Sequence, residues 1–141
     1  MTADPQTTSP DDVVARRLRR LDRLRITMIA ALAVQVLLGM ANNLWLTQHP
    51  PNLKTATPQG LLSAHEDVAY IILALAIWML VEAILSHRRG YIIPTATGLF
   101  GIALALGSGL AYWATEANGW SMSMTIGFTI AITSYAFAGR R

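Results

Sequence analysis

The chain has 141 residues, of which 53% are hydrophobic and only 13% are charged. A soluble domain carries nearer ~25% charged residues, so the composition indicates a single membrane domain without a separate catalytic domain. The absence of cysteine excludes disulfides, iron–sulfur clusters and thiolate metal sites. The basic residues flank apolar segments, so the high pI of about 9.8 favours lipid headgroups as partners and not nucleic acid.

The first 25 residues are polar and basic. Residues 1–12 include two prolines and lack apolar periodicity, so we expect a disordered tail. Residues 13–25 predict a basic amphipathic juxtamembrane helix, because arginines surround one face of four aliphatic side chains. Such a helix lies on the inner leaflet and binds anionic lipids, and docking of another protein is the alternative. The four aliphatic residues are Val14, Leu18, Leu21 and Leu24.

From Ile26 onward the chain consists of four apolar stretches separated by short polar breaks. Each stretch can cross a hydrocarbon core of ~30 Å as a helix, and a helix satisfies its own backbone hydrogen bonds in lipid. We therefore predict an all-α fold, a four-transmembrane-helix antiparallel bundle that forms one membrane domain over residues 26–141. The stretches cover residues 26–46, 61–85, 91–114 and 120–138.

The first apolar stretch has two interpretations. Gly39-Met40-Ala41 resembles the small-x-small site at which a signal peptide is cleaved. The apolar run continues to Leu46, however, and the charged region before it is long. We therefore expect an uncleaved first helix.

The charges predict the orientation. Ten of the eleven basic residues precede the first stretch, separate the second from the third, or end the chain, and Lys54 alone lies on the other side. Cytoplasmic segments are enriched in Lys and Arg, so we expect a multi-pass protein of the cytoplasmic (plasma) membrane with both termini in the cytoplasm. The ten are Arg16, Arg17, Arg19, Arg20, Arg23, Arg25, Arg88, Arg89, Arg140 and Arg141.

Small residues recur at intervals of four and predict where the helices pack, because small side chains let backbones approach closely in lipid. We expect the stripes of the third and fourth stretches to pair with each other, and homodimerisation through the third is the alternative. The first stretch carries a small and polar face that should point inward. The three stripes are Thr97, Gly101, Ala105, Gly109; Ser123, Gly127, Ala131; and Thr27, Ala31, Gln35, Gly39, Asn43.

His65 is the main candidate for cofactor binding, because an ionisable residue within a span is a functional candidate. If the helices cross as predicted, Met40 and Met122 lie at a similar depth, and b-type haem takes His/Met or His/His axial ligands. Haem b is therefore the candidate cofactor, with His65, Met40 and Met122 as candidate ligands. A bis-histidine site would use His49 or a second His65 from a dimer. The structural alternative is an interfacial histidine that is hydrogen-bonded to Asn43 or to a backbone carbonyl.

A Cu(I) site is a further alternative, because thioethers and imidazole are soft ligands. Met122 and Met124 lie near the predicted depth of Met40 and His65. The two methionines are two residues apart and point about 200° apart on a regular helix, so both reach one ion only if that segment unwinds. The identity of any metal stays open, and ordinary packing explains the methionines equally well.

The acidic residues of the second stretch have structural interpretations. Glu66 and Asp67 suit the positive end of a helix dipole, and Ser63 with Glu66 fits a capping box. Glu82 lies near the inner surface, where we expect it to snorkel or to pair with Arg89 or Arg25.

Residues 43–50 read NLWLTQHP, and Ala64-His65 opens the second apolar stretch. This arrangement resembles a group of uncharacterised small four-helix integral membrane proteins of high-GC actinobacteria. That group has Asn-Leu near the end of its first helix, His-Pro in the following loop, and a histidine that opens the second helix. The chain departs from the pattern at Ala69, where a glycine is expected. The resemblance implies a bacterial membrane location and a four-helix topology, and it implies no activity.

These features predict a non-enzymatic integral membrane protein that acts as an accessory or interaction subunit, without catalytic residues. Its partners are the lipid bilayer, anionic lipids at the arginine cluster, and a membrane protein or a second copy of the chain. Two alternatives are a haem b electron carrier that uses His65, and a small-solute or metal transport subunit that works as an oligomer.

Overall fold

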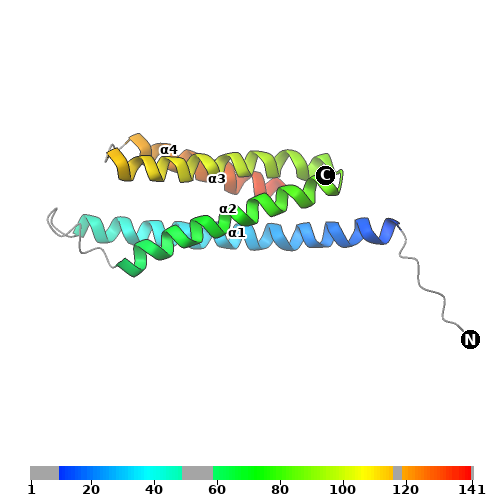
Figure 1. Ribbon diagram of the computed structural model, residues 1–141, viewed down its shortest axis with the longest axis horizontal. Helices are drawn as coiled ribbons and strands as arrows, with labels where there is room; N and C mark the ends of the chain where they lie inside the picture. The colour runs from blue at the N-terminus through cyan, green and yellow to red at the C-terminus, as the bar shows by residue number, and fades with distance from the viewer. Residues whose placement is uncertain (1–9, 49–58, 116–118, 141) are drawn as a thin grey trace, which may run out of the picture.

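The computed structural model describes residues 10–48, 59–115 and 119–140. Within these ranges the chain forms four helices and no strand, which confirms the predicted all-α fold. Helices that follow each other in the chain run antiparallel (Figure 1). The helices are α1 (Pro10–Gln48), α2 (Gln59–Leu85), α3 (Arg89–Thr115) and α4 (Gly119–Phe137).

Three of the helices are long and apolar enough to cross a membrane. α4 has 19 residues and is not among the three, because eight of its residues are Gly, Ser or Thr. Two of its exposed hydroxyls bond within the helix: Thr129 Oγ1 donates to the carbonyl of Thr125 at 2.8 Å, and Thr125 Oγ1 donates to that of Ser121 at 3.0 Å. The candidate spans are residues 11–44, 60–85 and 89–112.

α1 is one continuous helix of 39 residues, about 58 Å long at 1.5 Å per residue. It begins at Pro10, so residues 10–12, which we expected in the disordered tail, form its first turn; residues 1–9 lie outside the described residues. Residues 13–25 continue the helix axis of the first apolar stretch, and the start of α1 projects beyond the ends of the other helices (Figure 1). The basic segment and the first apolar stretch therefore form one helix, because neither Gly nor Pro separates them.

α3 and α4 pack backbone against backbone. A Cβ added to Gly101 would lie 2.6 Å from the carbonyl oxygen of Gly127. One added to Gly127 would lie 2.6 Å from the carbonyl oxygen of Gly101 and 2.7 Å from the nitrogen of Ala105. These contacts confirm the predicted pairing of the small-residue stripes of the third and fourth helices. The stripe of α3 is covered by α4, so it does not support homodimerisation through the same residues.

The contacts of α3 follow steps of three and four residues, and not the uniform steps of four that we expected. Thr97, predicted in the stripe, is exposed, and Gly98 takes its place against the ring of Tyr135, 2.6 Å from where a Cβ would lie. Further along, Ser108 Oγ donates to Ser123 Oγ at 2.8 Å. The reason is geometric, because two helices that cross at a small angle contact each other about every 3.5 residues.

The buried residues of α1 also depart from a uniform spacing of four. Thr27 and Asn43, both expected to point inward, are exposed, whereas Ala31, Gln35 and Gly39 are partly buried. Leu32 is 3% exposed and contributes to the apolar core. The other buried residues of α1 are Leu21, Leu24, Met28 and Asn42.

α2 connects the two halves of the bundle, because it packs against both α1 and α3 and crosses α1 obliquely (Figure 1). Its buried side chains include Ile72, Ala76 and Met79. α1 meets the C-terminal end of α4, where Arg25 Nη1 donates to the carbonyl of Ala138 at 2.6 Å. Two regions with polar side chains result: one on α1 and α2 around His65, and one at the end of the bundle where α2 and α4 end and α3 begins.

The contact between α3 and α4 predicts the effect of Gly101→Leu. The added side chain would overlap the backbone of Gly127, so we expect the free energy of unfolding in detergent to fall by about 1–3 kcal/mol or more. Thermal unfolding followed by circular dichroism measures this loss. Gly107→Leu is the matched control, because a Cβ at Gly107 would meet nothing within 4 Å. Equal loss in the two variants would contradict the assigned contact.

Candidate functional site

His65 lies in the interface between α2 and α1. Gln35 Nε2 donates to the backbone carbonyl of His65 at 3.0 Å and lies 3.3 Å from its ring nitrogen Nε2. The ring also lies over Gly39, where an added Cβ would be 3.3 Å from His65 Cε1. Among the described residues His65 therefore contacts Gln35 and Gly39, whereas Asn43, the partner that we expected for a structural histidine, is exposed.

The two methionines predicted to join His65 are not brought to it. Met40 is 57% exposed and Met122 is 71% exposed. Met40 follows Gly39 by one residue and therefore points about 100° away from the ring, while α4, which carries Met122, packs along α3. Met124 points toward Gly109 of α3, with its methyl carbon 4.0 Å from the Cβ position there.

The geometry around His65 fits neither a His/Met haem site nor the soft copper site. The described residues contain no group of three or more His, Cys, Asp or Glu side chains that could hold a metal ion. His49, the other histidine considered for haem, lies outside the described residues. Haem b and copper binding therefore gain no second ligand from the side chains that surround His65 in the described ranges.

The α1–α2 interface has unused hydrogen-bonding capacity. Gln35 Oε1, Asn42 Oδ1 and His65 Nδ1 are buried and have no partner among the described residues. Gln35 and Asn42 are seven residues apart and therefore lie on the same face of α1. The interface is therefore polar along about two turns of α1.

The acidic residues at the start of α2 are placed differently from the prediction. α2 begins at Gln59, four residues before Ser63, so Ser63 lies within the helix and does not cap it. Its Oγ donates to the carbonyl of Gly60 at 3.3 Å. Glu66 and Asp67 are exposed one turn further on. The predicted capping box is therefore wrong, because the helix starts earlier than the apolar pattern suggested.

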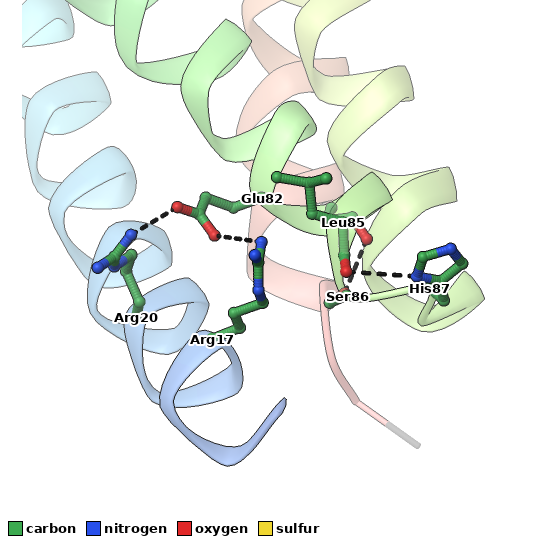
Figure 2. Close-up of polar contacts among 7 residues, drawn as sticks. Arg17, Arg20, Glu82, Leu85, Ser86 and His87 are labelled. Carbon is green, nitrogen blue, oxygen red and sulfur yellow. Dashed lines mark hydrogen bonds and ion pairs between the residues drawn. The ribbon is translucent and has the colours of Figure 1, made fainter. Parts of the chain in front are cut away.

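The end of the bundle where α2 and α4 end is organised around Glu82, a buried carboxylate that is 6% exposed. Arg20 Nη1 donates to Glu82 Oε1 at 2.7 Å, and Arg17 Nη1 forms an ion pair with Oε2 at 3.6 Å. Figure 2 shows both guanidinium groups reaching from α1 to the carboxylate on α2. The predicted partners Arg25 and Arg89 do not pair with Glu82, because Arg17 and Arg20 are the residues of α1 that lie level with it.

Two more polar contacts fasten the same part of α1. The hydroxyl of Tyr91, at the start of α3, donates to Asp22 Oδ1 at 2.8 Å. Arg25 donates to the carbonyl of Ala138, just after the end of α4. The basic half of α1 is thus joined to each of the other three helices or to the residues that directly follow them.

Two residues with a left-handed backbone conformation follow the C-terminal ends of α2 and α4. His87, after α2, has φ 53°, and its Nδ1 lies 3.3 Å from the carbonyl of Leu85 (Figure 2). Gly139, after α4, has φ 76° and donates its N–H to the carbonyl of Gly90 at 3.1 Å. A Cβ at Gly139 would lie 2.5 Å from the ring of Tyr91, so glycine is required there for both its backbone conformation and its size.

The outer surface of the basic segment carries a second group of arginines, which we name the arginine face. Its members are three, four and seven residues apart and therefore share one side of the helix. They line a shallow surface hollow of about 280 Å³. The arginine face consists of Arg16, Arg19, Arg20 and Arg23.

The sequence analysis treated the arginines of α1 as one cluster, so it predicted neither the ion pairs with Glu82 nor the arginine face. The spacing of the arginines could have indicated which of them face the other helices. Arg17 and Arg20 are three residues apart and lie beside Leu21 and Leu24, the inward-facing apolar residues. Arginines beside an apolar stripe border the packed interface, whereas those opposite it face outward.

Comparison of the chain with family models, curated proteins and solved structures gave no match. The resemblance to small membrane proteins of actinobacteria therefore stays a prediction.

Replacing His65 by alanine tests its structural role. His65→Ala removes the ring from its contact with Gln35 and Gly39, so we expect the free energy of unfolding to fall by about 1–3 kcal/mol. We expect no change in the visible absorption spectrum of protein purified from its native host. A haem band or bound copper near one per chain that disappears in His65→Ala would contradict this expectation. Met122→Ala, at an exposed position, is the control.

Proposed function

We propose that the chain is a non-enzymatic integral protein of the bacterial cytoplasmic membrane and acts there as an accessory or interaction subunit. All four helices cross the bilayer in this proposal, and both termini lie in the cytoplasm. The basic half of α1 is its interaction element, a fixed platform that presents the arginine face to an anionic partner at the membrane surface.

One observation carries this proposal: the basic half of α1 is held by specific contacts to the rest of the bundle. Arginines that only set topology act through their number and position, and need no defined geometry. Here Arg17 and Arg20 engage Glu82 on α2. Asp22 accepts from Tyr91 at the start of α3, and Arg25 donates to Ala138, just after the end of α4. A segment that is held in one orientation supports recognition, because the backbone that carries its outward-facing side chains is fixed before a partner binds.

The ion pairs of Glu82 also support a structural use of this carboxylate. Glu82 is engaged from two sides by guanidinium groups. A carboxylate held in this way serves as an anchor for α1. The haem and transport alternatives stay predictions, because none of the described contacts favours them.

The crossing of α4 is tested by labelling single cysteines, which are unambiguous because the chain has no native cysteine. Gly119→Cys lies at the start of α4, and Arg88→Cys and Arg140→Cys lie at the inner end of the bundle. We expect an impermeant maleimide to label Gly119→Cys in intact cells, and the other two only after permeabilisation. Labelling of Gly119→Cys and Arg140→Cys from the same side would mean that α4 does not cross. Reversed labelling of all three would overturn the orientation.

The fixed platform is tested with a spin label at Val14→Cys, an exposed position near the start of α1. In the parent protein we expect slow motion of the label, because the ion pairs of Arg17 and Arg20 with Glu82 hold the next turns of α1 in place. Glu82→Gln should make the label faster and lower the free energy of unfolding by about 1–3 kcal/mol, since a hydrogen bond to a charged group is lost. Glu66→Gln, the same change at an exposed position of α2, is the control. A label that already moves fast in the parent protein would contradict the platform.

A further inference from the structure

We infer that the arginine face is a binding site for the headgroup of a phospholipid that carries two phosphate groups. This inference rests on the proposed function, because it requires the inner end of the bundle to lie in the cytoplasmic leaflet. It adds the chemical identity of the anionic partner. Three features support it: the uncompensated charge of the face, its depth, and the apolar surface that continues below it.

The arginine face has more positive charge than the protein neutralises. Of its four members, only Arg20 has an ion pair among the described residues, with Glu82. Arg16, Arg19 and Arg23 have no ion pair within the described ranges, and Asp12 lies one turn before Arg16 on the same side of α1. Three unpaired arginines and one aspartate leave about two positive charges on this side. A phospholipid with a single phosphodiester offsets one of these charges, and a headgroup with two phosphates offsets two. Each guanidinium group can also donate two parallel hydrogen bonds to the oxygens of one phosphate, so several arginines can bind a headgroup with two phosphates.

The depth of the arginine face matches that of lipid phosphates. Arg20 lies level with Glu82, one turn before the end of α2, and Arg25 lies level with the end of α4. The seven residue steps from Arg16 to Arg23 span about 10 Å along the axis. The headgroup region of one leaflet is roughly 5–8 Å thick. The face therefore covers the headgroup layer, where a lipid reaches it without leaving the membrane.

The same side of α1 continues into the membrane as an exposed apolar surface. Ile26 is 64% exposed and Leu37 is 66% exposed, and both follow members of the arginine face at intervals of seven residues. Ala30 and Ala33, also exposed, lie between them and leave space for acyl chains. An amphiphile fits this arrangement, because its phosphates meet the arginines while its chains cover the apolar surface. A soluble anion would gain nothing from the apolar part, so we assign the site to a lipid.

The test uses the full-length protein purified in a neutral detergent, with bound lipid measured by native mass spectrometry. The probes are cardiolipin, which has two phosphates, and phosphatidylglycerol, which has one, compared at equal phosphate concentration. We expect one cardiolipin per chain to be retained more strongly than phosphatidylglycerol. The variant R16Q/R19Q/R23Q should weaken cardiolipin binding by about a hundredfold, because each arginine near an anionic lipid contributes roughly fivefold. Inorganic phosphate at equal phosphate concentration should compete poorly.

The matched control is R88Q/R89Q/R140Q, which removes three exposed arginines from the same end of the bundle. It should retain cardiolipin like the parent protein. Equal loss in both triple variants would show charge attraction without a site and would overturn the inference. Equal retention of phosphatidylglycerol and cardiolipin, or full competition by inorganic phosphate, would also overturn it.

Two further measurements separate folding and orientation from lipid binding. Circular dichroism checks that each variant is folded, and the single variant R19Q, expected to lose roughly fivefold in affinity, replaces the triple variant if that one unfolds. The cysteine labelling described above tests the orientation independently. Reversed labelling would overturn the proposed function together with the lipid site. Labelling as expected, with no selective lipid retention, would overturn the lipid site alone.

Discussion

The burial of Glu82 near the C-terminal end of α2 is the constraint from which the arrangement of α1 follows. A carboxylate in this position is costly unless cations compensate it, and Arg17 and Arg20 do so. Because the two helices are antiparallel, this contact sets their register along the whole length. His65 lies 17 residues before Glu82 on α2, and Gln35 lies 18 residues after Arg17 on α1, so these two meet as well. The same register places the arginine face at the level where the other three helices end.

The sequence predicted the parts of the fold that depend on local pattern. The number of helices followed from apolar length, and the contact between Gly101 and Gly127 followed from the stripes of small residues. The choice of Gly98 over Thr97 did not follow, because the face that a helix presents depends on the angle at which its neighbour crosses. The continuity of α1 was also missed. A change from basic to apolar composition does not end a helix, and only a change in backbone preference does so.

Less of the candidate site could be predicted, because side-chain partners depend on tertiary register. The position of His65 in an interface was foreseen, but its partner is Gln35, two turns from Asn43 along α1. Met40 and Met122 were placed by depth alone, and depth does not fix the direction in which a side chain points around its helix. Both are exposed. The partners of Glu82 were assigned from proximity to the membrane surface, which several arginines share.

The hydrogen bond from Arg25 to the carbonyl of Ala138 joins residues 113 positions apart in the chain. This separation has a consequence for biogenesis. During synthesis α1 is complete long before residue 138 exists, so Arg25 has no such acceptor during that interval. The contact between α1 and the end of α4 is therefore among the last to form. A ribosome-bound chain that has not yet completed α4 has its first helix formed without this contact to hold it.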